Sequence, residues 1–504
     1  MKLTRAQLCN LVLAIPAIML MFALNGDAPA QTAKAVNTQA SCADMLHLPN
    51  VTAATQTDTY CRVSFTLRPA THSEINSEIN SEVWLPLASS WNGKLLMEGG
   101  GGFVGSINTG GLAYAVHRGY VGASTDTGHT GGTGEFLLNA DKITDFAYRA
   151  VHETAVEAKK IIAAYYGHGP LLSYFEGCST GGRQGLMSAQ RYPADFDGIV
   201  AGAPAYDPIY LPAWRMRLFM TVLRSPLYAL PPEKLKLLNG AVLDKCDALD
   251  GVKDHFISDP RKCNFDPNVL KCKTASTASC LTPEQLETVN AAYSDLRSST
   301  GEILFPGVPF GGELNWQLGP RKTAPGMLDV DTFRYLANQD PAWDWHSFDL
   351  QKDVDRALLR GKELRATDPN LRSFKSRGGK LLLYHGWSDG GSGGSISAYS
   401  TISYYDSVLK YMGSNQDNWL RLFMVPGMGH CGEGTGLNQF EMVAALDSWR
   451  QQGDAPKSIT AVRVDEHGHI DMSRPLCPYP QIAAYKGSGG IDDAQNYVCK
   501  ASGN

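Results

Sequence analysis

A serine lies at the centre of the sequence Gly-Cys-Ser-Thr-Gly, residues 177–181, which has the G-x-S-x-G spacing of a nucleophile elbow. So short a pattern also arises by chance in a glycine-rich chain, so its surroundings decide its meaning. The apolar segment Leu171–Phe175 before it is typical of a short strand, and Gly185–Arg191 after it is typical of a helix. In such a turn the glycines let strand and helix approach closely and leave the hydroxyl exposed. We predict that Ser179 is a nucleophile; the alternative is an ordinary glycine-rich turn.

A serine nucleophile needs a base, and the base needs a carboxylate that fixes its tautomer. The apolar segment Lys380–Tyr384 leads into a loop that contains Asp389, and Leu420–Val425 leads into a loop that contains His430. A serine on this kind of elbow is followed along the chain first by the acid and then by the histidine. We therefore predict Asp389 as the acid and His430 as the base. His385 is the rival base, but it precedes the acid and would break that order.

Acyl transfer to a serine also needs N–H donors for the oxyanion that develops on the substrate. The backbone N–H of Thr180, directly after the serine, is one candidate. A glycine-rich loop that follows an early strand supplies the other, and Gly99–Gly102 lies one residue after the apolar segment Lys94–Met97. We predict Gly102 as the second donor, and the alternative is a flexible glycine linker.

Three carboxylates lie within eight residues of one another, around a glycine, in the segment 246–256. They are typical of a hard cation with oxygen ligands, although the spacing is not that of an EF-hand. The predicted ligands are the carboxylates and two backbone carbonyls, namely Asp247, Asp250, Asp254, Val252 and Phe256. On spacing alone a solvated acidic turn explains the segment as well as Ca²⁺ does.

The elements that would position these residues alternate between strands and helices. Helical spacing predicts a long helix over Phe146–Tyr166, and strands precede and follow it, which indicates a parallel sheet and an α/β core. From about residue 206 to 376 the alternation stops. It resumes with the strands that begin at Lys380 and Leu420, and a helix is predicted over Gln439–Gln451. We predict an α/β domain over 31–205 and 377–504 that is interrupted by an inserted domain over 206–376. Its aromatic residues Trp316, Trp343, Trp345 and Phe348 could contact a planar acyl group or could belong to the core of the insertion.

The chain contains eleven cysteines, and whether they form disulfides depends on the cellular compartment. Cys9 lies in the apolar N-terminal segment, and the remaining ten suit disulfides in an exported chain. Many connectivities are open, but pairing neighbours in sequence would join Cys42 with Cys61, Cys246 with Cys263, Cys272 with Cys280, and Cys477 with Cys499. Those pairings leave Cys178 and Cys431, which adjoin the predicted nucleophile and base. If Ser179 and His430 lie within hydrogen-bond reach, these two cysteines also come within reach of a disulfide.

The first thirty residues have the arrangement of a secretory signal peptide. Lys2 and Arg5 precede an apolar run, Leu8–Leu24, and Ala-Pro-Ala at 28–30 provides a cleavage site. The run is shorter than a clean membrane span, so we predict a signal peptide over 1–30 and a secreted or periplasmic protein. The 504 residues carry a formal net charge of −5, which argues against nucleic-acid and membrane-surface partners. Nothing in the sequence fixes the oligomeric state.

Three long motifs resemble the tannase/feruloyl esterase family. They are Gly-Cys-Ser-Thr-Gly-Gly-Arg-Gln-Gly at 177–185, Tyr-Pro-Ala-Asp-Phe-Asp-Gly-Ile-Val-Ala-Gly-Ala-Pro at 192–204, and Pro-Gly-Met-Gly-His-Cys at 426–431. The resemblance runs from about Cys42 to Cys499. It implies an α/β-hydrolase with a lid domain, a triad of Ser179, Asp389 and His430, and a disulfide between the residues next to Ser and His. It also favours a structural Ca²⁺ site in the lid over a solvated acidic turn.

The resemblance implies hydrolysis of a small aromatic ester. We expect a secreted serine carboxylesterase that acts on phenolic-acid esters, feruloyl esters first. Gallate esters and terephthalate monoesters are the alternative substrates. Two rival hypotheses come from other classes: a calcium-dependent binding protein without catalysis, and a metallohydrolase whose catalytic centre is the aspartate cluster.

Overall fold

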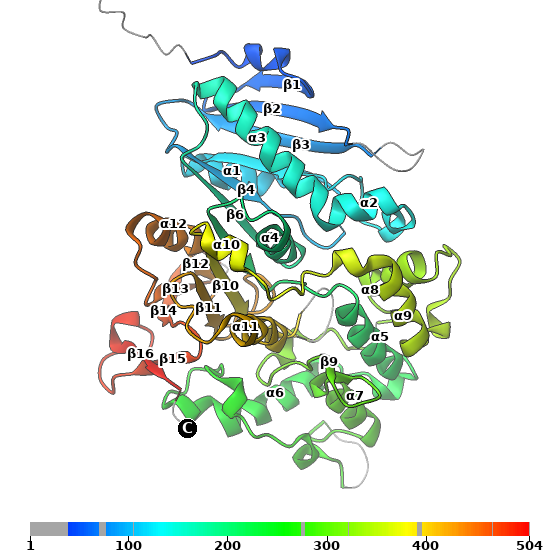
Figure 1. Cartoon of the computed structure of the whole chain (residues 1–504). Helices are drawn as coiled ribbons and strands as arrows, with labels where there is room; N and C mark the ends of the chain where they lie inside the picture. The colour runs from blue at the N-terminus through cyan, green and yellow to red at the C-terminus, as the bar shows by residue number, and fades with distance from the viewer. Residues whose placement is uncertain are drawn as a thin grey trace, which may run out of the picture. The chain divides into compact units, whose positions relative to one another are not determined.

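A nine-stranded sheet runs through the part of the chain that the structure describes (Figure 1). The structure is a computed structural model and describes residues 39–69, 77–103, 105–273, 278–320, 322–390, 396–465 and 467–502. The predicted signal peptide, residues 1–30, lies outside them. The strand order is β1-β2-β3-β5-β4-β6-β7-β10-β11. The strands are β1 (Val51–Gln56), β2 (Tyr60–Leu67), β3 (Ile79–Pro86), β4 (Lys94–Glu98), β5 (Val121–Thr125), β6 (Leu172–Cys178), β7 (Gly198–Gly202), β10 (Lys380–Gly386) and β11 (Leu420–Val425).

Strands β5, β4, β6, β7, β10 and β11 are parallel to one another, whereas β1, β2 and β3 pair in antiparallel fashion. The carboxyl ends of parallel strands meet at one edge of a sheet, and this is where an open α/β sheet carries its ligand site. The loops after β4, β6, β10 and β11 carry the predicted site residues. The fold is the α/β-hydrolase fold expected from the sequence, and it places these loops at the same edge of the sheet.

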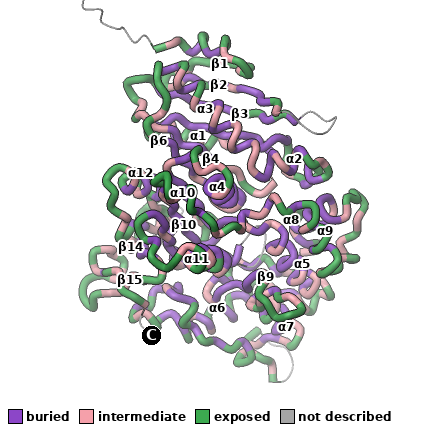
Figure 2. Tube along the Cα trace, in the orientation of Figure 1, coloured by how far each residue is buried: buried purple, intermediate pink, exposed green. Residues whose placement is uncertain are grey.

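Both faces of the sheet are covered, and the strand residues alternate between two cores. Leu95 and Met97 belong to the core on one side, whereas Leu96 belongs to the core on the other. The covering helices are α1 (Thr109–His117), α3 (Ala150–Tyr166), α4 (Thr180–Arg191), α10 (Arg372–Ser376), α11 (Ala398–Met412) and α12 (Met442–Gln452). Helix α4 is buried along most of its length (Figure 2). A short helix, α2 (Ala140–Thr144), and a π-helical turn, Asp145–Arg149, precede α3, so the first turn of the predicted helix 146–166 is π-helical.

The segment between β7 and β10 adds no strand to the central sheet in its described part. Its elements are α5 (Tyr210–Val222), α6 (Pro232–Cys246), α7 (Pro283–Tyr293), β8 (Leu296–Arg297), β9 (Ile303–Phe305), α8 (Met327–Asp331) and α9 (Leu350–Gly361). They share a hydrophobic core around Trp214, Phe305 and Phe333, and they lie together in Figure 1. We call residues 210–361, from α5 to α9, the insertion.

Smaller sheets follow the last strand of the central sheet. They consist of β12 (Gln439–Phe440), β13 (Ile459–Val464) and β14 (Ile470–Leu476), and of β15 (Gln481–Tyr485) and β16 (Tyr497–Ala501). Phe440 pairs with Ala461 of β13, and its ring packs on Tyr384. A helix that begins at 439, as the sequence pattern suggests, is therefore wrong by three residues, because a strand pairing holds its first two.

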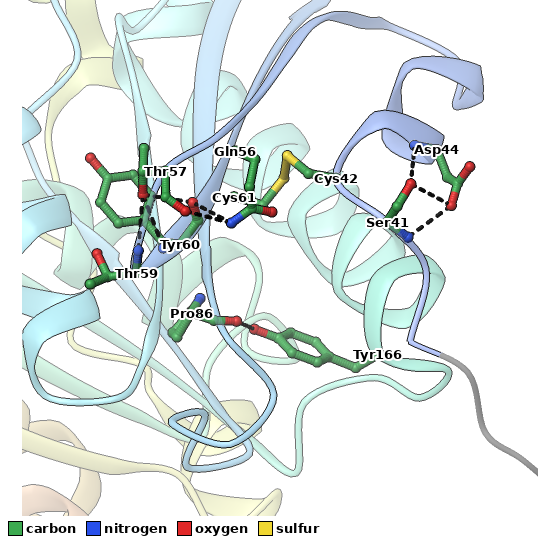
Figure 3. Close-up of a disulfide and its surroundings, with 10 residues drawn as sticks. All are labelled: Ser41, Cys42, Asp44, Gln56, Thr57, Thr59, Tyr60, Cys61, Pro86 and Tyr166. Atoms are coloured by element: carbon green, nitrogen blue, oxygen red, sulfur yellow. Dashed lines mark hydrogen bonds between the residues drawn. A yellow bond between two sulfur atoms is a disulfide. The ribbon is translucent and has the colours of Figure 1, made fainter.

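Five disulfides form among the described residues: the four pairs obtained by joining sequence neighbours, and the remaining pair Cys178–Cys431. Cys42–Cys61 joins the N-terminal turn Ala43–His47 to β2 (Figure 3). In the same view the hydroxyl of Tyr166 donates to the carbonyl of Pro86, which ties the end of α3 to β3. Disulfides persist in oxidising compartments, so their number fits an exported protein. No helix in the described ranges is both long and apolar enough to cross a membrane.

Candidate active site

Ser179 sits in a sharp turn between β6 and α4. Its backbone angles are φ 62° and ψ −121°, a conformation that L-residues other than glycine rarely adopt. A Cβ added to Gly177 would lie 2.6 Å from the backbone of Gly181, so this close approach of strand and helix requires glycine. The Ser179 N–H donates to the carbonyl of Gly202 on β7, which holds the turn against the sheet. The turn has the geometry of a nucleophile elbow, with Ser179 at the N-terminus of α4.

Asp389 and His430 meet although 41 residues separate them. The Nδ1 atom of His430 lies 2.7 Å from Oδ2 of Asp389. Burial would raise the pKa of Asp389, but the attraction of His430 and hydrogen bonds from His385 and His430 lower this pKa to about 2. Burial lowers the pKa of His430, yet the charge of Asp389 and its hydrogen bond outweigh burial and raise that pKa above its usual value. The pair therefore consists of a carboxylate and a more basic imidazole.

His385, the rival base, occupies a different place. It is fully buried, and both of its ring nitrogens have hydrogen-bond partners: Asp389 and the Ile396 carbonyl for Nε2, and Thr401 for Nδ1. The His430 side chain, by contrast, is 21% exposed. This difference favours His430 as the base.

A disulfide links the residue directly before the predicted nucleophile to the residue directly after the predicted base. Cys178 and Cys431 are 253 residues apart in sequence, and their Cα atoms lie 6.0 Å apart. The bond joins the end of β6, directly before Ser179, to the loop after β11, directly after His430. The positions of these two cysteines beside the predicted nucleophile and base predict this bond, and the structure contains it.

One cavity is lined by Ser179 together with both predicted oxyanion donors, Thr180 and Gly102. The Thr180 hydroxyl donates to the Gly102 carbonyl at 3.0 Å, so the glycine loop is fastened beside the serine. Gly102 adopts a φ of +52°, which favours glycine. The amide N–H of Gly100 also donates to the Gln184 side chain of α4, 3.0 Å away, which holds the loop from its other end.

The remaining cavity wall combines aromatic rings and residues of the insertion. Phe103 and Phe146 lie edge-on to each other with ring centroids 5.8 Å apart. The insertion contributes chiefly apolar side chains and one cation, namely Leu211, Pro212, Arg215, Leu328 and Thr332. Arg215 is buried and pairs with buried Asp329 at 2.7 Å.

The aromatic residues that the sequence suggested for the acyl group lie elsewhere. Trp316 is buried against Tyr293, and Trp343, Trp345 and Phe348 pack on the core of the insertion. None of the four belongs to the lining of the cavity at Ser179. Phe103 and Phe146 were missed because their contact joins segments far apart in sequence. The only local signal was that Phe103 follows the glycine loop.

The three predicted calcium-binding carboxylates have different hydrogen-bond partners. Asp247 accepts the backbone N–H groups of Asp254 and His255, and Asp250 accepts the Val252 N–H at 3.0 Å. Asp254 is buried, and its Oδ2 atom accepts a hydrogen bond of 2.7 Å from Arg474. Its other oxygen, Oδ1, is buried and has no hydrogen-bond partner among the described residues.

The donor chemistry of this cluster suits a hard cation, because it offers carboxylate oxygens and one of them is buried without a partner. Within the described ranges, however, no three His, Cys, Asp or Glu side chains are arranged as a metal-binding group. An ion would therefore have to replace some of the present hydrogen bonds of Asp247 and Asp250.

Sheet order, elbow and the Asp389–His430 pair together define an α/β-hydrolase. The family described as tannase and feruloyl esterase matches residues 61–500. The chain belongs to this family, and its relatives support a carboxylic ester hydrolase.

Individual relatives agree with this assignment. A probable feruloyl esterase B-2 of Aspergillus flavus is 34% identical over 437 residues, which cover 82% of each chain. The crystal structure of an esterase from Aspergillus oryzae has a TM-score of 0.84 at 31% identity and covers 91% of this chain and 98% of that one. The crystal structure of feruloyl esterase B from Aspergillus oryzae has a TM-score of 0.82 at 29% identity and covers 91% of this chain and 99% of that one.

Proposed function

We propose that the protein is an exported serine carboxylesterase that hydrolyses esters of phenolic acids, feruloyl esters first. The single observation that carries the serine mechanism is the cavity in which Ser179, Gly102 and Thr180 meet. The Cys178–Cys431 bond, which joins the residue before Ser179 to the residue after His430, supports a role for the Asp389–His430 pair at this serine. The phenylalanine rings in that cavity suit a planar aromatic acyl group. The relatives named as feruloyl esterases support the choice of acid.

The reaction follows from the roles of the groups. The Ser179 hydroxyl attacks the ester carbonyl while Nε2 of His430 takes its proton, and the N–H groups of Gly102 and Thr180 stabilise the oxyanion. His430 then gives that proton to the leaving alkoxide as the C–O bond breaks, which leaves an acyl-enzyme. Water, deprotonated by His430, then attacks the acyl-enzyme. As the bond between the acyl carbon and the Ser179 oxygen breaks, His430 returns the proton to that oxygen, and the acid leaves. Asp389 orients the imidazole and stabilises its charged form throughout.

The insertion would act as the lid of this site, since Leu211, Arg215 and Leu328 form part of the cavity wall. A signal peptide over residues 1–30 would direct export, in keeping with the five disulfides.

Ca²⁺ would be held by the carboxylates of Asp247, Asp250 and Asp254 with the carbonyls of Val252 and Phe256. Support comes from the unpartnered buried oxygen of Asp254 and from the oxygen-rich donor set. These residues do not line the cavity at Ser179, so the ion would be structural.

A fluorophosphonate probe tests the mechanism, because it labels only an activated serine. Labelling should map to Ser179 and should vanish, together with hydrolysis, in Ser179→Ala, while Ser188→Ala in the same helix keeps both. Turnover of methyl ferulate, methyl gallate and a terephthalate monoester then tests the acid, with ferulate expected to be fastest. A wild-type protein that neither reacts with the probe nor hydrolyses these esters would contradict the proposal and favour a non-catalytic binding protein.

A further inference from the structure

A second histidine bonds the same carboxylate oxygen as the proposed base. Nε2 of His385 lies 2.9 Å from Asp389 Oδ2, and Nδ1 of His430 lies 2.7 Å from that oxygen. His385 is fully buried at the end of β10, and no step of the proposed reaction uses it.

The hydrogen bonds of His385 fix which of its nitrogens carries the proton. Nε2 faces the Asp389 carboxylate and also the Ile396 carbonyl at 3.1 Å, and both of these groups can only accept. Nε2 is therefore the donor. In the neutral ring Nδ1 is then an acceptor, and the hydroxyl of Thr401 on α11 lies 2.7 Å from it and donates. The buried hydroxyl of Thr401 thus selects the tautomer that donates to Asp389.

These contacts close a ring of hydrogen bonds around the carboxylate. The Ile396 N–H donates to Asp389 Oδ1 at 2.9 Å, while the Ile396 carbonyl accepts from His385. Asp389 therefore receives one backbone donor on Oδ1 and two imidazole donors on Oδ2. We propose that His385, oriented by Thr401, is a positioning residue that holds the Asp389 carboxylate in the orientation that bonds His430. This inference rests on the serine mechanism proposed above.

The arrangement has an electrostatic consequence for the base. The charged groups that face His430 are Asp389, Arg215 from α5 and Glu433 from its own loop. Because His385 takes up part of the charge on Asp389, its loss would leave that charge to act on His430 alone. The pKa of His430 would then rise further, and the freed carboxylate would hold the imidazole less well.

The test uses Thr401→Val, which keeps the shape of the side chain and removes the hydroxyl. Its matched control is Ser400→Ala, because Ser400 is a buried neighbour on α11 whose hydroxyl has no hydrogen-bond partner in the described part of the chain. His385→Leu removes the donor to Asp389, and His385→Gln restores an N–H donor. The readouts are kcat, KM and the pH profile of kcat/KM with a 4-nitrophenyl ester, and the pH titration of His430 by NMR in protein labelled with ¹⁵N-histidine.

We expect Thr401→Val to lower kcat about tenfold and His385→Leu about 100-fold, with KM changed less than about twofold. In both variants the acid limb of kcat/KM and the NMR titration of His430 should move to higher pH, by about one unit in His385→Leu. His385→Gln should recover most of kcat, and Ser400→Ala should match the wild type in every readout.

An unchanged acid limb and an unchanged His430 titration in Thr401→Val, with only the melting temperature lowered, would overturn the proposal and leave His385 a packing residue. Thr401→Val carries the test if His385→Leu does not fold. The NMR titration of His430 can be measured in a protein that does not turn over substrate. If the wild type hydrolyses no ester, the proposed function is contradicted, but the titration still shows whether His385 affects the pKa of His430.

Discussion

The charge of Asp389 sets the pH range in which His430 can act as a base. The deprotonated imidazole is the active form, so kcat/KM should rise with pH through the pKa of His430. Burial lowers this pKa, but Asp389 raises it above 6.5, and the acid limb is therefore expected above 6.5.

Asp389→Asn tests this coupling. With the carboxylate gone, burial and the positive charge of Arg215 both lower the pKa of His430 and outweigh the weaker effect of Glu433, which raises it. The acid limb should therefore move to lower pH. We expect kcat to fall by roughly 10³- to 10⁴-fold, because the amide no longer stabilises the imidazolium or fixes its tautomer. The pH profile of kcat/KM is the measurement, and Asp368→Asn is the control outside the site. If the acid limb of kcat/KM stayed at the same pH in Asp389→Asn, Asp389 would not interact with the base.

The residues that could be predicted from the sequence are those with a local pattern. The glycines around Ser179 identify the elbow, and Asp389 and His430 each follow an apolar strand that ends at the same sheet edge. His385 was considered only as a rival base, because its role depends on Thr401 and Ile396, and no spacing reveals those contacts. The cavity wall was missed for the same reason, since Phe103 and Phe146 meet only in the folded chain.

The Cys178–Cys431 bond fastens the elbow after β6 to the loop after β11. Since it closes a loop of 253 residues, the chain-entropy model gives it about 5 kcal/mol of stabilisation, against about 3 kcal/mol for Cys477–Cys499, whose residues are 22 apart. Only the first bond adjoins the proposed nucleophile and base.

Replacing both Cys178 and Cys431 by Ala should therefore lower the melting temperature and also lower kcat, measured well below that temperature, by about tenfold or more. The matched control replaces Cys477 and Cys499 by Ala, and it should lower the melting temperature with little change in kcat. Equal values of kcat for the two double variants would show that the bond stabilises the fold without aligning the site.

Element boundaries show how far the pattern of apolar residues extends. The strand expected over 171–175 continues to Cys178, because Gly177 and Cys178 pair with β7 although glycine weakens the strand signal. The helix expected from 439 starts at Met442, because β13 captures the two residues at 439 and 440 as a strand. In both cases a tertiary pairing overrides the local sequence preference.

Residues 246–261, which include the predicted calcium ligands and are called the acidic segment below, join the insertion to the C-terminal part of the chain. Asp254 pairs with Arg474 of β14, Asp259 accepts the hydroxyl of Ser502 at 2.7 Å, and Arg261 donates to Tyr479 at 2.6 Å. An ion bound to Asp247, Asp250 and Asp254 would neutralise like charges at this junction. Its contribution would be to the stability of the fold, since the segment lies outside the lining of the cavity at Ser179.

Removal of calcium should consequently lower the melting temperature before it affects turnover. For free Ca²⁺ at about 1,000 times its Kd, the folded state gains about 4 kcal/mol, so dialysis against a chelator should lower the melting temperature by several degrees and added Ca²⁺ should restore it. Asp250→Asn should abolish this response, whereas Asp244→Asn, exposed on α6 outside the cluster, should retain it. Differential scanning calorimetry and kcat of the chelated enzyme at low temperature are the measurements. Immediate loss of turnover without a change in melting temperature would favour a metal-dependent hydrolase, and no response in either would leave the segment an acidic turn closed by Arg474.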